Sequence, residues 1–170
     1  LRIAQLEREL TSLARQSPAC TELLTIPGIG LLTATAMVAA TGGSVSHFKD
    51  ARHFASWFGL TPKEFSSGST RKLGRISKKG DRYLRMLLTH GARAVLRAAE
   101  LARRAGKPLD GLRTWATESQ ARAHHNKAAC ALANKLARVC YAVLRDHTPF
   151  GSQQPRQEKK LTRTAFAIAA

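Results

Sequence analysis

Two adjacent serines, Ser66 and Ser67, lie in a Gly/Ser-rich stretch that is followed by a dense run of basic side chains. A serine hydroxyl can attack a phosphodiester if its proton is removed and the growing negative charge on the phosphorus-bound oxygens is stabilised. Such an attack would conserve the bond energy as a phosphoserine ester, so that strands are rejoined without ATP. Because Ser-Ser-Gly is first of all a turn sequence, local chemistry leaves two interpretations open: a nucleophile or a plain turn.

Basic residues around these serines are the second candidate feature. Residues 71–85 contain a run of cations and a single acid, Asp81. A basic run is often only a solvated face, but its place beside a Gly/Ser-rich loop favours contacts with phosphates. The candidate nucleic-acid-binding residues of the wider segment 63–85 are Lys63, Arg71, Lys72, Arg75, Lys78, Lys79, Arg82 and Arg85.

The distribution of charge indicates the class of partner. The 170 residues include 28 Lys and Arg against 11 Asp and Glu, a net charge of +17. Residues 1–50 carry four side chains of each sign, residues 51–110 fourteen basic against four acidic, and residues 111–170 ten against three. This excess predicts a polyanionic partner, with nucleic acid first and a membrane surface second. No apolar run approaches the roughly 20 residues of a spanning helix. Because nucleic acid is preferred over a membrane surface, we expect no membrane partner.

A second phosphate-binding element is predicted around Ile26-Pro27-Gly28-Ile29-Gly30. Gly28 and Gly30 permit a tight turn with positive φ, which would expose backbone N–H groups beside the N-terminus of the following helix. Two short apolar helices flank this turn, so we predict a helix-hairpin-helix motif that holds a DNA phosphate without reading sequence. A plain helical corner without a ligand is the alternative, and no basic residue follows the turn before Lys49.

Helical periodicity indicates the elements that must position these residues. Apolar spacing predicts an all-α, mainly helical fold, with helices near residues 51–58, 83–99, 109–122 and 126–145. Residues 59–76 lose this periodicity and are predicted to form one long functional loop or a small hairpin. Ile3, Leu6, Leu10 and Leu13 follow a heptad spacing within Leu1–Gln16. That helix is predicted either to pair with another helix or to pack onto its own domain.

The expected organisation has three parts. Residues 1–17 would end an upstream coiled-coil helix, residues 18–150 would form the helical domain, and residues 151–170 would be a flexible basic tail. Three cysteines in no paired pattern favour a reducing, cytoplasmic compartment.

The run from Leu24 through Leu88 resembles the C-terminal transposase domain of the IS110 family of bacterial insertion sequences. The motifs that carry the resemblance are Ile26–Gly30, Phe54–Pro62, Phe65–Gly68, Gly74–Gly80 and Tyr83–Arg85, joined by Asn134–Arg138 and Thr148–Phe150. The resemblance implies a recombinase that cuts and rejoins DNA through a serine. Ser67, which precedes the glycine, matches the family's catalytic position, and the adjacent Ser66 is its rival.

The resemblance also implies partners outside this chain. An upstream RuvC-like acidic domain would bind Mg²⁺, and a structured guide RNA would select the DNA sites in a nucleoid-associated protein that oligomerises through the N-terminal helix. Because Asp50, Glu64, Asp81 and Asp110 form no clustered pattern, we expect no metal or cofactor here and no complete recombination by this chain alone. Two other functions stay open: a non-catalytic helix-hairpin-helix DNA-binding module and a helical RNA-binding protein.

Overall fold

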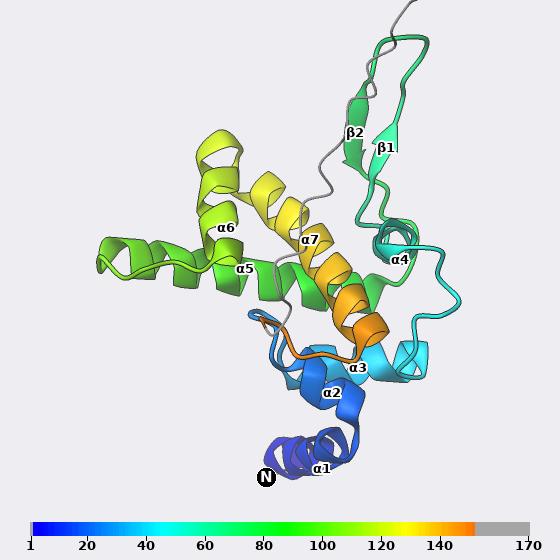
Figure 1. Cartoon of the computed structure of the whole chain (residues 1–170), viewed down its shortest axis with the longest axis vertical. Coiled ribbons are helices and arrows are strands. Elements are labelled where there is room, and N and C mark those ends of the chain that lie inside the picture. Colours follow the sequence, from blue (N-terminus) through cyan, green and yellow to red (C-terminus); the bar gives the residue numbers. More distant parts are fainter. Residues whose placement is uncertain (1, 152–170) are drawn as a thin grey trace, which may run out of the picture.

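The computed structural model describes residues 2–151, and within that range the fold is mainly helical, as the sequence predicts. The elements follow in the order α1 (Arg2–Gln16), α2 (Pro18–Leu23), α3 (Leu31–Thr41), α4 (Ala51–Trp57), β1 (Pro62–Glu64), β2 (Leu73–Ile76), α5 (Arg82–Arg104), α6 (Gly111–Arg122) and α7 (His125–Asp146). Of the two forms predicted for residues 59–76, the small hairpin is the observed one (Figure 1). The predicted basic tail lies, from residue 152 onward, outside the described residues.

The core forms where α5 and α7 pack against each other, with α4 on α7 and α6 against both. Leu84, Leu88 and Val95 of α5 are buried, which confirms the apolar stripe that predicts this helix. Leu132 and Leu136 contribute the corresponding buried positions of α7. Burial of each such side chain stabilises the fold by about 1.5–3 kcal/mol relative to exposure. The crossing of α5 and α7 therefore forms the rigid body from which the hairpin projects (Figure 1).

Isolated acidic residues begin three of the helices. The side chain of Asp50 accepts the amide N–H groups of Arg52 and His53 at 2.8 and 2.9 Å, and these bonds, the one from His53 above all, lower the pKa of Asp50. Asp81 accepts the Leu84 amide, and Asp110 accepts the Arg113 amide, at 2.7 Å each. An N-cap of this kind stabilises a helix by about 1 kcal/mol. These acids of the sequence thus serve as helix caps.

The turn between α2 and α3 packs closely on the middle of α5. Gly28 has φ +88°, and a Cβ atom built on it would lie 2.8 Å from the carbonyl oxygen of Gly91. A Cβ on Gly91 would in turn overlap the carbonyl oxygen of Gly28. The two glycines therefore allow two backbones to touch, and this contact explains Gly28 without any ligand. Phosphate binding by Gly28 and Gly30 stays a prediction.

Helix α1 lies at the opposite end of the molecule from the hairpin (Figure 1). It packs against α2 and α3, and Ala14 is its buried residue. The predicted heptad seam faces solvent, with Ile3, Leu6 and Leu13 exposed by 82%, 50% and 60%. The helix therefore packs onto its own domain, which is one of its two predicted alternatives, but it does so mainly through a face other than the seam. Pairing of the seam with another helix stays a prediction. None of the helices within residues 2–151 is long and apolar enough to cross a membrane.

The cysteines differ in burial, and this yields a first prediction. Cys20 and Cys140 are buried, whereas Cys130 is half-buried. Burial raises the pKa of the Cys140 thiol to about 12, so it holds almost no thiolate at neutral pH. We expect a thiol reagent at pH 7 to modify Cys130 first, and Cys140 only after denaturation. Mass spectrometry of the labelled chain measures this, with Cys130→Ser as the control. Equal labelling of Cys130 and Cys140 in the folded chain would contradict the packing of α7.

Candidate nucleic-acid interface

The two candidate serines lie next to the turn that closes the β1–β2 hairpin. The amide of Phe65 donates to the Lys72 carbonyl at 2.8 Å, and Ser67 and Thr70 exchange backbone hydrogen bonds of 3.2 and 3.1 Å. Gly68 takes φ +56° in the turn between that last pair, a conformation that favours glycine. The hairpin projects away from the helical body (Figure 1). Both serines are therefore presented to solvent on an arm.

The backbone pairing continues past β1 through the Phe65–Lys72 hydrogen bond and the isolated Ser67–Thr70 bridge. Because successive side chains of paired, extended backbone alternate, we infer that the two serines lie on opposite faces of the arm. Ser66 shares its face with Glu64, and the Ser66 hydroxyl donates to Oε1 of Glu64 at 2.7 Å. The same hydroxyl oxygen accepts the amide N–H of Lys72 at 3.1 Å. Nε of Arg71 lies 3.6 Å from the same carboxylate oxygen. The Ser66 hydroxyl thus takes part in the internal bonding of the hairpin, beside a carboxylate that would repel a phosphate.

Ser67 occupies a different environment. Within residues 2–151, no hydrogen bond to another protein group engages its hydroxyl. Phe65 lies two residues away on the same face, 63% exposed, and its ring approaches so close to Gly74 that a Cβ there would lie 2.8 Å from it. Lys72 is paired with Phe65 across the hairpin, so it belongs to this face as well. A free hydroxyl, a cation and an exposed aromatic ring therefore share the face that lacks Glu64.

The structure brings most of the predicted phosphate-binding residues onto one continuous region. Lys63, Arg71, Lys72 and Arg75 are exposed on the arm, and Lys78, Lys79 and Arg82 are exposed at its base and at the start of α5. Arg85 is turned inward, where its Nη1 donates to the Phe58 carbonyl at 2.8 Å. That bond gives Arg85 a supporting role beneath the arm, and its phosphate contact stays a prediction. Gly28 and Gly30 lie apart, in the turn on α5.

Close backbone contacts fix the base of the arm. The amides of Ser77 and Lys78 donate to the carbonyls of Thr61 and Gly59 at 2.8 and 3.0 Å. Gly80 lies so near Trp57 that a Cβ on it would overlap the Trp57 carbonyl oxygen. The sequence does not predict these contacts, which form a joint at the base of the arm. The loss of helical periodicity over residues 59–76 indicates where the helices stop, but not which backbone segments touch.

A side chain of α7 completes the joint. Nδ2 of Asn134 donates to the Leu60 carbonyl at 3.2 Å, although 74 residues separate the two. The only sequence signal for Asn134 is its place in a motif shared with the family resembled. The arm is consequently held by the same α7 helix that forms the core.

Metal binding finds no support among the described residues. In residues 2–151, no group of three or more His, Cys, Asp or Glu side chains is placed to hold a metal ion. Asp50, Asp81 and Asp110 cap helices, and Glu64 binds Ser66 and Arg71. The arrangement therefore offers a hydroxyl and cations, without the carboxylate cluster that a hard divalent ion requires.

Comparison with known proteins gives one consistent family. Residues 20–106 match the model of the transposase IS116/IS110/IS902 family. The chain is 42% identical over 147 residues to a Pseudomonas aeruginosa protein named "Probable family 20 transposase", covering 86% of this chain and 41% of that protein. It is 38% identical over 148 residues to the transposase of IS1328 from Yersinia enterocolitica, covering 87% and 42% respectively. A pilin gene-inverting protein of Moraxella bovis is 36% identical over 91 residues, 51% of this chain and 28% of that protein. The chain thus spans about two fifths of the length of the first two relatives.

Proposed function

Because the chain belongs to the IS116/IS110/IS902 transposase family, we propose that it is the DNA-binding part of a longer transposase and supplies the serine that cleaves DNA. The match to a protein named as gene-inverting supports a reaction in which DNA strands are both cut and rejoined. The observation that carries the proposal is the exposed Ser67 hydroxyl on a basic arm, which has no hydrogen-bond partner among residues 2–151 and lies opposite to the face inferred for Glu64.

The geometry supports the following chemistry at Ser67. Its Oγ attacks the phosphorus of a phosphodiester and loses its proton to solvent or a base, while the bond to one deoxyribose oxygen breaks and that oxygen takes up a proton. The product is a phosphoserine ester, and attack by a second deoxyribose hydroxyl reverses the step and releases the serine. Lys72 on the same face, with Arg71 and Arg75 nearby, would stabilise charge on the phosphorus-bound oxygens. Rejoining therefore needs no external energy source.

Further parts of the proposal concern what this chain does not contain. Mg²⁺ would be held by an acidic domain elsewhere in the longer polypeptide, since residues 2–151 hold no cluster of three or more metal-ligating side chains. A structured guide RNA would select the DNA sites in the cytoplasm, at the nucleoid. The exposed Ile3–Leu13 seam of α1 would join copies of the protein through a coiled coil.

Trapping a covalent intermediate tests the cleavage proposal. The complete transposase is incubated with guide RNA, Mg²⁺ and target DNA, denatured, and examined for DNA that migrates with protein. A phosphoserine-linked adduct is the expected result, whereas tight binding without any adduct would favour the non-catalytic DNA-binding module. The 170-residue chain alone is expected to form no adduct.

Binding by the chain itself should respond steeply to salt, which is a second prediction. Each DNA phosphate neutralised by Lys or Arg contributes about 0.9 to the slope of log K against log salt concentration. The cations of the arm and its base lead us to expect a slope of roughly 4–6 for duplex DNA. Fluorescence anisotropy of a labelled duplex between about 50 and 200 mM salt measures it. A flat response would remove even the general DNA-binding proposal, and a strong preference for RNA would favour the RNA-binding alternative.

A further inference from the structure

A second basic surface runs along α5, away from the arm. Arg82, Arg93, Arg97 and Arg104 are exposed on this helix. At about 100° per residue their directions fall within about 60° of one another, so they share one face, and Arg82 and Arg104 are about 33 Å apart along the axis. None of the last three belongs to the cluster predicted around the serines. This helix face thus carries arginines from the base of the arm to the far end of α5.

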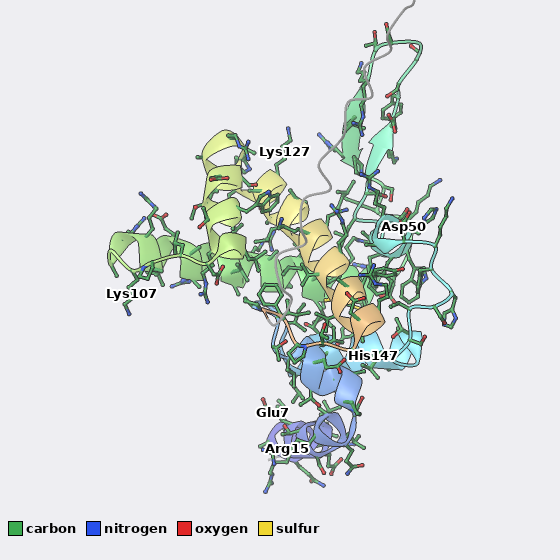
Figure 2. The ribbon with its side chains drawn as sticks, viewed as in Figure 1. Glu7, Arg15, Asp50, Lys107, Lys127 and His147 are labelled. Atoms are coloured by element: carbon green, nitrogen blue, oxygen red, sulfur yellow. The ribbon has the colours of Figure 1, made fainter. Side chains whose placement is uncertain are left out.

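The C-terminal half of this face opens into a groove between α5 and the junction of α6 with α7. The groove has a volume of about 470 Å³, and its lining includes Arg93, Arg97, Arg104 and Leu101 of α5, Gln120 of α6 and His125 of α7. Figure 2 labels two further cations on the neighbouring elements, Lys107 just beyond α5 and Lys127 near the start of α7.

The groove holds more positive charge than its acid neutralises. Glu100 is the acidic residue of its lining, and it pairs with Arg103 and Arg104 at 3.0 and 2.8 Å. The hydrogen bond from Arg103, and secondly the one from Arg104, lowers the pKa of Glu100 to about 2. This carboxylate is therefore ionised at neutral pH and is already paired with these two arginines. Arg93 has a long hydrogen bond of 3.4 Å to Asn126. Arg97 has no ion pair or hydrogen bond within the described part of the chain. Two guanidinium groups therefore remain available for an external anion.

We propose that this groove and the arginine face of α5 bind the sugar–phosphate backbone of duplex DNA beside the cleavage site. The face begins at Arg82, next to the base of the arm, so one duplex can contact both surfaces. Its length matches about one turn of duplex DNA, roughly 34 Å. Planar guanidinium groups suit phosphate oxygens, and the lining has none of the Phe, Tyr or Trp side chains on which single strands stack. That the duplex runs from this groove to the cleavage site rests on the proposed function. That the groove binds duplex DNA does not depend on it.

Two charge-matched variants of the 170-residue chain test the proposal. Arg93→Gln/Arg97→Gln removes two cations from the groove, and Arg2→Gln/Arg15→Gln removes two exposed cations from α1 at the opposite end of the molecule (Figure 2). Affinity for a labelled DNA duplex of about 30 base pairs is measured by anisotropy across a salt series. We expect the groove variant to lose about tenfold in affinity and about 1.8 in the salt slope, and the α1 variant to lose far less.

Two more measurements, on Glu100→Gln and on an RNA duplex, join the double variants in distinguishing binding in the groove from attraction by net charge and from RNA binding. Glu100→Gln frees Arg103 and Arg104, so we expect a few-fold gain in affinity from this change. Equal losses in the two double variants would overturn the proposal, because net charge alone would then account for binding. A loss for an RNA duplex that exceeds the loss for DNA would overturn the assignment to DNA. None of these measurements requires cleavage, so failure of the Ser67 proposal and failure of this one give different results.

Discussion

Replacing Ser67 with alanine is expected to abolish the covalent protein–DNA adduct in the complete transposase while leaving DNA affinity within about twofold. The change removes the proposed nucleophile, and loss of a nucleophile reduces turnover by roughly 10³-fold or more. The exposed Ser67 side chain makes no hydrogen bond to the protein within residues 2–151, so its removal should not disturb the hairpin. Adduct formation is followed by denaturing electrophoresis of labelled target DNA, and binding is measured separately by anisotropy.

Ser66→Ala is the matched control, because it deletes a hydroxyl one residue away. This change removes the hydrogen bonds to Glu64 and to the Lys72 amide, which should loosen the arm and slow adduct formation several-fold without abolishing it. The opposite result, an adduct with Ser67→Ala and none with Ser66→Ala, would make Ser66 the nucleophile and Glu64 its base. If both variants form the adduct normally, the arm does not supply the nucleophile.

Replacing Gly91 with alanine is expected to lower the free energy of unfolding by about 2–3 kcal/mol, although alanine is the better helix former. Alanine gains about 1 kcal/mol of helix propensity, but its Cβ would overlap the Gly28 carbonyl and force the α2–α3 turn away from α5. For a chain of this size such a loss lowers the melting temperature by about 5–10 °C. Thermal and urea unfolding followed by circular dichroism measure both quantities.

Gly111→Ala provides the control for the same exchange elsewhere. Gly111 begins α6, and a Cβ on it would meet nothing within 4 Å. We expect that variant to be neutral or more stable by less than about 1 kcal/mol, because only the unfolded chain loses freedom. A Gly91→Ala chain as stable as the original would mean that the turn does not rest on α5 in solution.

The choice between Ser66 and Ser67 shows what local sequence omits. The sequence places both serines in a basic, glycine-rich segment that it predicts to be a long loop or a small hairpin, but it does not predict the register in which the hairpin pairs. Pairing decides the faces, because successive side chains alternate only once the backbone is extended. Glu64 then lies with Ser66, and Phe65 and Lys72 lie with Ser67. The arm is built from exposed residues, so buried and exposed side chains do not alternate along its strands. The hydrophobicity of the sequence therefore gives little information about how the strands pair.

The sequence by itself determined the mainly helical fold, the apolar stripe of α5, the concentration of charge after residue 50 and the likeness to one transposase family. These properties are local or additive. Apolar periodicity indicates which face of a helix is buried, and the net charge of a segment is the sum of its residues' charges. Only the tertiary structure decided which partners meet. It seats Gly28 on Gly91, turns Arg85 towards the Phe58 carbonyl and brings Asn134 to the base of the arm. Such contacts join segments that are distant in the sequence, and whether they meet depends on the packing of the whole core. The pattern of apolar residues indicates that a side chain is buried, but not which residues pack against it.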